Sequence, residues 1–285
     1  MGISIKKKLA DFFTYLFLIV LVVIVVFPLI YAVAASFKPL SELFSDADKV
    51  FPIHPTLENY KTVLHSEVIN FRVMTVNSIY YTLINVFGVI MSSSMCAYAF
   101  ERGHFPGRKA MFVTIGALMF INMGTITVYP KFDILNAIHL NKSLWGLIVL
   151  NLFAIPTVNI YLVKSYIATL PKEMDEAAKI DGCSFFGTFI RITMPLLKPI
   201  LATIGVLAFN GSWNEYLMPT IFTISNPSQQ TLMVGINAMK SSGESASNWS
   251  VMLAAAVLAL VPVLIAYAVG NRYFVKGLSA GAVKG

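Results

Sequence analysis

Residues able to bind ions, solutes or a wet partner surface gather in two places of this apolar sequence. The first is the stretch from Leu170 to Pro199, whose charged side chains are Lys172, Glu173, Asp175, Glu176, Lys179, Asp181, Arg191 and Lys198. So many charges need water or a polar partner, so this stretch is not expected to cross a membrane. The second is Asn210 to Pro219, NGSWNEYLMP, where Glu215 lies in an otherwise apolar segment. An ionisable group in a membrane span indicates a cavity or a packed polar contact.

The first stretch has the pattern of a short helix, a glycine turn and a second helix. Pro171 suits the first helical position, and the acidic residues after it meet the positive end of the helix dipole. Gly182 is expected to end this helix, and a second helical piece from Ser184 to Arg191 runs into Pro195. Charge and periodicity alone would favour an ordinary amphipathic surface helix between two spans.

No catalytic or metal-binding pattern accompanies these stretches. The four histidines show no paired ligand spacing, so the sequence predicts no metal site. No GxxxxGK[ST] pattern occurs, so this chain is not expected to hydrolyse ATP. Cys96 and Cys183 lie in no redox or metal spacing and are expected to be unpaired. The sequence therefore does not predict an enzyme.

The composition is that of an integral membrane protein. Apolar residues make up 57% of the 285 residues and charged residues only 12%, about half the usual charged share. The net charge of +7 is better explained by cytosolic lysine and arginine than by binding to nucleic acid. Spans and short connections take up almost the whole chain, which leaves no room for a separate soluble domain.

The hydropathy pattern predicts an all-α fold of six spans with both termini in the cytosol. The expected spans are residues 12–35, 71–100, 110–128, 144–163, 200–222 and 251–269. They form a single membrane domain over 12–270, with the charged loop at about 166–199 between spans four and five, a cytosolic N-terminus of 1–11 and a cytosolic tail of 271–285. Fourteen of the 21 lysines and arginines fall on the proposed cytosolic side, which supports this orientation. The first run is longer than a signal-peptide core and is expected to be retained, with a kink at Pro28.

Two sets of motifs in this sequence resemble a known family. The first set resembles the "EAA" loop of inner-membrane subunits of binding-protein-dependent ABC importers. It consists of Glu176-Ala177-Ala178, Gly182 and Ile192 to Pro195. The second set resembles the carbohydrate branch of this family, in particular the shorter permease of the maltose type. It consists of Leu170-Pro171, Asp181-Gly182, Pro195 to Pro199 and Trp213-Asn214-Glu215. The similarity runs along nearly the whole chain, as far as Gly285.

This resemblance implies that the charged loop is a coupling helix that docks into a cleft of a cytosolic ATPase. There a glutamate meets a basic residue, and small alanines permit close approach. The residues expected to serve ATPase coupling are Glu173, Glu176, Ala177, Ala178, Asp181 and Gly182. The implied partners are a second, homologous permease in a heterodimer, two ATPase subunits, an extracytoplasmic sugar-binding protein and membrane lipid. ATP and magnesium would be used by the ATPases, with no cofactor bound by this chain.

The resemblance also implies a sugar path through the spans. The candidate residues are Asn210, Trp213, Asn214, Glu215, Tyr216, Asn122 and Asn151. The two aromatic rings could stack on the apolar face of a sugar while the amides and the carboxylate bond its hydroxyls. The alternative is helix packing with an interfacial aromatic belt. The further amides Asn77, Asn85 and Asn159 are expected to bond between helices or to face a cavity.

The expected function is therefore that of a permease subunit in a bacterial-type cytoplasmic membrane, translocating a sugar, in particular an oligosaccharide, by ATP-driven alternating access. Two alternatives stay open, an ABC permease for a non-sugar solute and an ion-coupled secondary transporter. Against the latter stands the lack of a pair of buried acidic residues for ion coupling. The outer loop 223–250 is expected to contact the binding protein and to help dislodge the sugar, as in the maltose-type subunit, or else to be merely solvated.

Overall fold

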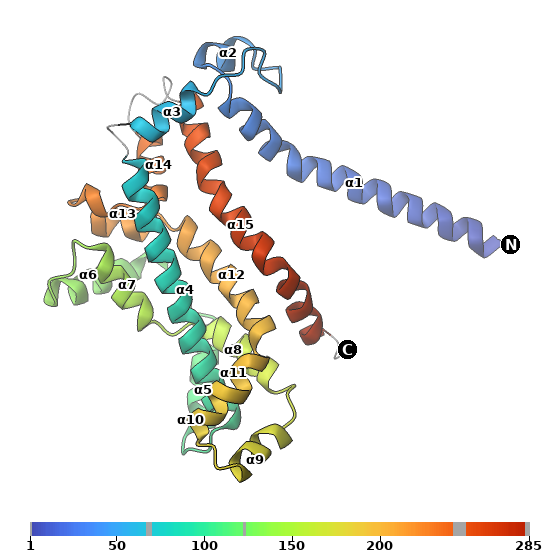
Figure 1. Cartoon of the computed structure of the whole chain (residues 1–285), viewed down its shortest axis with the longest axis vertical. Helices are drawn as coiled ribbons and strands as arrows, with labels where there is room; N and C mark the ends of the chain where they lie inside the picture. Colours follow the sequence, from blue (N-terminus) through green and yellow to red (C-terminus); the bar gives the residue numbers. More distant parts are fainter. Residues whose placement is uncertain (1, 67–69, 122–123, 242–248, 283–285) are drawn as a thin grey trace. The chain divides into compact units, whose positions relative to one another are not determined.

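The computed structural model describes residues 2–66, 70–121, 124–241 and 249–282, and these ranges contain helices and no β-strand (Figure 1). The all-α fold is thereby confirmed for the part of the chain that the structure describes. The chain divides into two compact units, Met1–Phe71 with Ile236–Leu260, and Arg72–Gly235 with Val261–Gly285.

The first unit begins with the most apolar of the candidate membrane spans among the described residues. Its helices are α1 (Gly2–Ser36), α2 (Leu40–Ser45) and α3 (Glu58–His65), with parts of α14 (Leu232–Ser241) and α15 (Trp249–Ala282). α1 contains Pro28, and its large apolar side chains are exposed along most of its length, as expected for a span that faces lipid. The short helices α2 and α3 lie in a segment that contains Pro39, Pro52 and Pro55.

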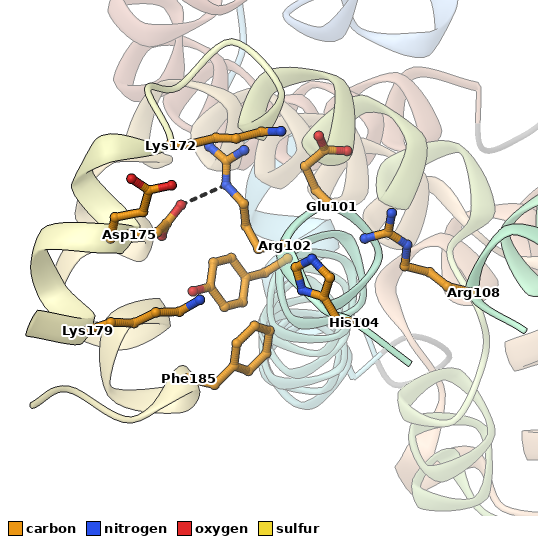
Figure 2. Close-up of a pocket in the computed structure, with 10 residues that line it drawn as sticks. Glu101, Arg102, His104, Arg108, Lys172, Asp175, Lys179 and Phe185 are labelled. Atoms are coloured by element: carbon orange, nitrogen blue, oxygen red, sulfur yellow. Dashed lines mark ion pairs between the residues drawn. The ribbon is translucent and has the colours of Figure 1, made fainter. Parts of the chain in front are cut away.

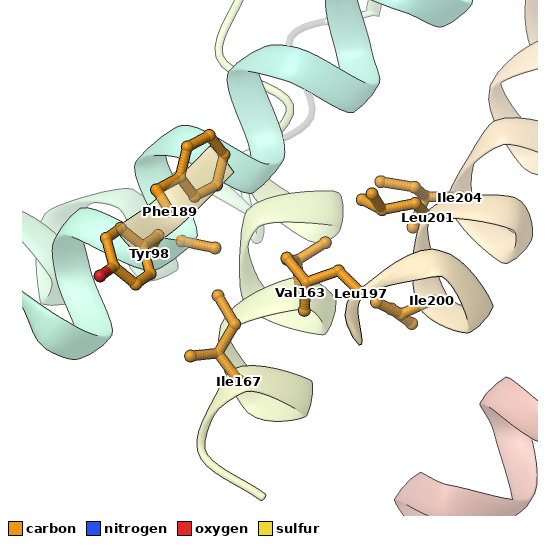
Figure 3. Packing of buried hydrophobic residues seen from close by; sticks show 9 residues of the cluster. Tyr98, Val163, Ile167, Phe189, Leu197, Ile200, Leu201 and Ile204 are labelled. Carbon is orange, nitrogen blue, oxygen red and sulfur yellow. The ribbon is translucent and has the colours of Figure 1, made fainter. Parts of the chain in front are cut away.

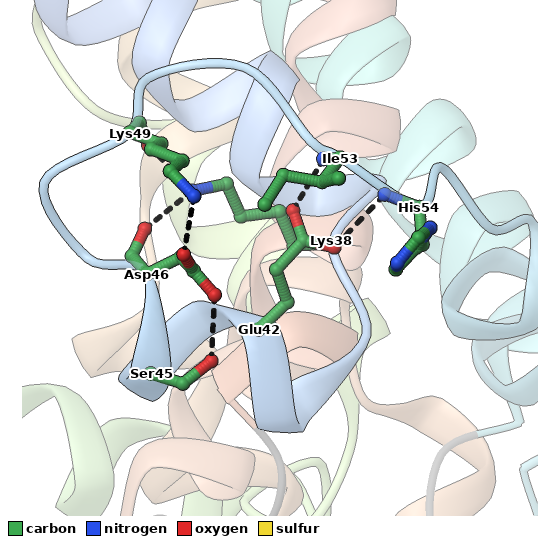
Figure 4. Close-up of polar contacts among 7 residues, drawn as sticks. All are labelled: Lys38, Glu42, Ser45, Asp46, Lys49, Ile53 and His54. Carbon is green, nitrogen blue, oxygen red and sulfur yellow. Dashed lines mark hydrogen bonds and ion pairs between the residues drawn. The ribbon is translucent and has the colours of Figure 1, made fainter.

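A buried lysine and a buried glutamate hold the irregular segment after α1 (Figure 4). Lys38 is fully buried, and its ammonium group donates hydrogen bonds to the main-chain oxygens of Asp46 and Lys49. The carboxylate of Glu42, 5% exposed, accepts two main-chain N–H groups of the same segment at 2.6 and 3.0 Å. Since a buried charge without partners is costly, these bonds fix the path of a chain that forms little regular structure.

The second unit is built around α4 (Phe71–Arg102), a helix of 32 residues that contains no proline. The helices that follow it are α5 (Arg108–Leu118), α6 (Val128–Ala137), α7 (Leu144–Leu152), α8 (Thr157–Ile167), α9 (Glu173–Ile180), α10 (Phe185–Thr188), α11 (Met194–Leu196), α12 (Lys198–Asn214) and α13 (Leu217–Thr223). A π-helix, Phe189–Thr193, connects α10 to α11.

Two clusters of buried apolar side chains pack against α4. One joins α4 to α8, the π-helix and α12 through Tyr98, Val163, Ile167, Phe189, Leu197, Ile200, Leu201 and Ile204 (Figure 3). The other joins α4 to α6, α7 and α13 through Tyr81, Leu135, Leu144, Leu147, Ile148 and Phe222. In a lipid environment such packing acts through van der Waals contact more than through exclusion of water, so close fit decides its strength.

Four stretches of the described residues are long and apolar enough to cross a membrane. They are Lys7–Ser36, Phe71–Arg102, Leu144–Ile167 and Trp249–Gly270. A fifth crossing results if Phe185–Leu196 and Lys198–Asn214, which meet at a bend of 78°, act as one span. The expected count of six spans and the orientation of the termini stay predictions.

The third expected span differs from the structure. Instead of one helix over 110–128, α5 ends at Leu118, and the next turns are closed by tighter bonds from the N–H groups of Phe120 and Ile121 to carbonyls three residues back. Gly124 then has φ +49°, a left-handed conformation that an α-helix does not contain. The described part of this stretch is therefore interrupted.

The fifth expected span, 200–222, also needs a correction. α12 ends at Asn214, Glu215 is extended with ψ 124°, and α13 begins at Leu217. The break coincides with the one residue of this segment that carries a carboxylate. The fourth span is interrupted between α7 and α8 next to Pro156, because proline lacks the N–H group that would continue the helix.

Candidate functional site

The charged loop folds as a helix, a glycine turn and a second helix, as the sequence predicts. The expected place of Pro171 is wrong, because α9 begins at Glu173 after Lys172, and Pro171 precedes the helix. α9 carries Glu173, Asp175 and Glu176 in its first turn. Gly182 follows with φ +81°, and the next N–H group, that of Cys183, bonds back to the carbonyl of Ala178 at 2.9 Å. This closure is the usual end of a helix at a left-handed glycine.

Most of the residues expected to serve ATPase coupling lie on the open face of this loop. Glu173, Glu176, Ala177, Asp181 and Gly182 are exposed. Ala178 is the exception, since it is buried and packs against the rest of the protein. Ile180, which the sequence analysis did not single out, is 87% exposed and adds an apolar side chain to this face. The face is thus a mixture of acidic, small and apolar groups that a partner surface could cover.

An ion pair joins this loop to the end of α4 (Figure 2). Nε of Arg102 lies 2.7 Å from a carboxylate oxygen of Asp175, and the two side chains are 8% and 15% exposed. A neighbouring pair joins Lys164 to Glu101 at 2.8 Å. The pairing of Arg102 could not be predicted, because nothing in a single sequence shows which carboxylate an arginine meets.

A cavity of about 320 Å³ opens beside this ion pair, between the end of α4 and α9. Its lining includes Arg108, Lys172, Glu176 and Lys179, and Figure 2 shows the labelled side chains converging on it. Both basic and acidic groups line the cavity, which suits contact with a charged protein surface better than binding of an apolar ligand.

The second candidate site is a polar network at the break between α12 and α13. The hydroxyl of Tyr81 on α4 donates to Glu215 at 2.8 Å, and the amide of Asn151 on α7 donates to the same hydroxyl at 3.2 Å. The sequence analysis proposed Glu215 and Asn151 but missed Tyr81, since a tyrosine in an apolar helix looks like a packing residue. The signal available was its hydroxyl within the same span as Asn77 and Asn85.

The other candidates for a sugar path are only partly brought together. Trp213 is 2% exposed and stacks on Phe209, with ring centroids 5.7 Å apart, so the expected stacking of its ring on a sugar is not available in this structure. Asn214 and Tyr216 are exposed next to Glu215. Asn210, which accepts hydrogen bonds from Asn214, lines a mostly apolar cavity of about 270 Å³.

The remaining amides have different roles. Asn77 donates to the main-chain oxygens of Ser228 and Gln230, and so fixes the turn before α14. Asn85 is 3% exposed, and its amide atoms have no hydrogen-bond partner among the described residues. Asn122 lies outside the described residues. No cluster of three metal-ligating side chains occurs within the ranges that the structure covers.

Together these features define a polytopic membrane protein with an exposed charged helix on one loop and a polar network within its spans. The chain belongs to the family of binding-protein-dependent transport system inner membrane components, which it matches over residues 4–279. Members of this family are permease subunits and not enzymes. The resemblance drawn from the EAA loop is thereby confirmed.

Similar proteins cover almost the full chain. It is 32% identical to the galactooligosaccharides transport system permease protein GanQ of Bacillus subtilis, over 99% of this chain and 98% of that protein. It is 31% identical to the arabinooligosaccharides transport system permease protein AraQ of Halalkalibacterium halodurans, over 92% of each. Among solved structures, a chain of a bacterial ABC transporter that imports the acidic polysaccharide alginate superposes with a TM-score of 0.81 at 24% identity, covering 94% of this chain and 98% of that one. The last likeness concerns the fold alone.

Proposed function

We propose that this chain is a permease subunit of an ABC importer for an oligosaccharide. The observation that carries the proposal is similarity over nearly the whole length to permeases named for galacto- and arabino-oligosaccharide transport. The polar network of Tyr81, Asn151 and Glu215 within apolar helices is consistent with a path for a hydroxyl-rich solute.

The coupling step is assigned to α9. ATPase subunits that bind ATP and magnesium would close on each other and move α9, whose exposed face carries Glu173, Glu176 and Ala177. Because α9 is a short rigid helix with a fixed turn after it, it can pass that movement on as a rigid body. Alternating access then follows, with the cytosolic side closing as the cavity opens outward.

The assembly would be asymmetric, with a second, homologous permease, two cytosolic ATPases and an extracytoplasmic sugar-binding protein. Polar groups in the spans need a partner surface or water, which a second permease would supply together with half of the sugar cavity. The membrane domain would comprise 12–270, both termini would be cytosolic, and the membrane would be the cytoplasmic one. The loop 223–250 would face the binding protein; its residues 242–248 lie outside the described ranges.

The sugar path would run past the break between α12 and α13. Glu215 and Asn151 would bond sugar hydroxyls, and the exposed amides of Asn210 and Asn214 and the ring of Tyr216 would complete the contacts from this chain. Trp213 would contribute by packing, since its ring is buried against Phe209.

The test is transport by the reconstituted complex in liposomes, with ATP inside and the binding protein outside. Galactotriose, arabinotriose and a digalacturonide are offered in turn, and uptake of at least one that requires ATP and binding protein is expected. Uptake driven by an ion gradient without ATP would overturn the proposal, and so would ATP-dependent uptake of a non-sugar solute alone. Omission of the second permease is the control for the heterodimer, and uptake without it would remove that part.

A further inference from the structure

α4 is attached to its neighbours near both ends, and it is unbroken between them. Tyr81 and Arg102 are separated by about 32 Å at 1.5 Å per residue. The helix contains no proline, so nothing in this stretch interrupts its main-chain hydrogen bonds. A displacement of α4 at one of these ends is therefore transmitted to the other end.

At the Arg102 end, α4 holds the charged loop on both sides of its glycine turn. Before the turn, the guanidinium of Arg102 pairs with Asp175 of α9 at 2.7 Å. After the turn, the ring of Tyr98 packs against Phe185 and Phe189, with ring centroids 4.6 and 5.2 Å apart. The loop cannot shift along α4 without breaking one of these contacts.

The same guanidinium also binds the end of α8. Nη2 of Arg102 donates to the main-chain oxygens of Ile167 and Leu170, at 3.2 and 2.7 Å. The carbonyl of Ile167 also accepts the N–H group of Leu170, and the cation adds a favourable charge at the negative end of the α8 dipole. Arg102 is 8% exposed, which limits screening of these contacts by solvent ions. One side chain thus joins α4, α8 and α9.

At the other end, α4 holds two segments of the second unit. Asn77 donates to two carbonyls of the 228–230 turn at 2.9 and 2.8 Å, and Ser78 accepts a main-chain N–H group just after that turn at 2.8 Å. Tyr81 donates to Glu215 at the break between α12 and α13. These are direct hydrogen bonds from α4 side chains, so they follow the movement of the helix.

We propose that Arg102 is a positioning residue that makes α4 the transmission element between the coupling loop and the polar network around Glu215. The inference rests on the proposed function, because α9 must be the contact with the ATPase. Movement of α9 passes through Asp175 and Arg102 to α4 and α8 together, and through α4 to Tyr81. A neutral side chain at position 102 leaves the exposed face of α9 in place and removes the ion pair that joins α9 to α4.

The experiment uses the full complex in liposomes and the variants Arg102→Gln and Asp175→Asn. Three quantities are measured: co-purification of the ATPases, stimulation of ATP hydrolysis by sugar-loaded binding protein, and sugar imported per ATP hydrolysed. The sugar is the one of the three named above that the wild-type complex imports. We expect co-purification to persist while stimulation falls about tenfold, a usual size for coupling between distant sites. Sugar imported per ATP falls with it.

The matched control is Glu101→Gln, which breaks the neighbouring 2.8 Å pair with Lys164 of α8 and keeps both partners of the Arg102–Asp175 pair. Its stimulation is expected to stay within about twofold of wild type. Wild-type stimulation in both test variants overturns the inference, as does an equal loss in the control. If Arg102→Gln does not fold, Asp175→Asn decides alone, since it keeps both carbonyl bonds of Arg102. A wild-type complex that neither imports sugar nor responds to binding protein overturns the proposed function instead.

Discussion

The hydroxyl of Tyr81 lies 2.8 Å from Oε2 of Glu215, and this hydrogen bond joins the unbroken helix α4 to the break between α12 and α13. It gives the carboxylate a donor within a segment that otherwise offers it little beyond apolar side chains. The amide of Asn151 donates to the same hydroxyl, which leaves the single proton of Tyr81 free for Glu215.

Tyr81→Phe removes this donor while keeping the ring in its apolar cluster. Leaving a carboxylate without its charged hydrogen bond is expected to lower the free energy of unfolding by about 1.5–3 kcal/mol and to reduce sugar uptake. Thermal unfolding in detergent and uptake into liposomes measure the two effects. Tyr80→Phe is the control, because Tyr80 packs on Trp145 by ring stacking. Equal effects of the two substitutions would show that the Tyr81–Glu215 bond has no special role.

Glu176→Lys reverses a charge on the exposed face of α9 without disturbing a buried contact. We expect normal membrane insertion, with loss of ATPase co-purification or of its stimulation by binding protein, because a basic partner on the ATPase would be repelled. The control is Glu58→Lys, at an exposed first-turn glutamate of α3. Stimulated ATP hydrolysis at the wild-type rate in Glu176→Lys would exclude this glutamate from coupling.

Gly182→Ala tests the turn after α9. At φ +81° an added Cβ meets no atom within 4 Å, so the cost comes from the backbone alone and is expected to be about 1–2 kcal/mol. Gly182→Asn should be milder, since asparagine tolerates the left-handed region. Gly116→Ala, in the helix α5 and also with open space around it, is the control and should be neutral or stabilising. Thermal unfolding of all three variants gives the order, and a harmless Gly182→Ala contradicts the prediction.

Low pH is expected to destabilise the segment after α1, because it protonates the carboxylate of Glu42. Burial raises the pKa of this carboxyl, but the N–H groups of Ile53 and His54 and the charge of Lys38 outweigh it, so the pKa lies below its ordinary value of 4.5. A lowered folded-state pKa stabilises the segment above the ordinary value, and this contribution is lost as pH falls through the lowered one.

Hydrogen exchange at the amides of Ile53 and His54 measures this loss, compared at about pH 6 and about pH 3.5 after correction for intrinsic rates. Both amides should lose protection at the lower pH. Glu42→Gln should show a weaker pH dependence, which does not vanish because Asp46, whose pKa is lowered by its bonds with Lys49 and Ser45, titrates in the same range. Identical profiles for wild type and Glu42→Gln would assign the effect to Asp46.

Local patterns in the sequence were sufficient to predict the charged loop. The acidic first turn and Gly182 act on their own neighbours, so a single sequence contains the information for helix α9 and its end. The long apolar runs of α1 and α4 were equally clear, because lipid requires length and hydropathy.

Contacts between distant residues were not predictable in the same way. Glu215 at the break bonds Tyr81, which lies far away in the sequence, and hydropathy does not show such a pairing. Trp213 was expected to face a sugar, but its burial against Phe209 follows from the rotation of α12 within the bundle, which composition does not determine. The partner of Arg102 was hidden for the same reason.

The segment Phe185–Leu196 and helix α12 meet at a bend of 78°, so they form two arms that are nearly perpendicular to each other. A displacement along the axis of Phe185–Leu196 acts nearly at right angles to the axis of α12. Helix α12 would therefore rotate about its Lys198 end instead of sliding along its own axis. Helix α12 is about 26 Å long at 1.5 Å per residue, so a small rotation about its Lys198 end produces a larger displacement at its Asn214 end. Asn214 is followed directly by Glu215, so the residues proposed to contact the sugar lie where this displacement is greatest.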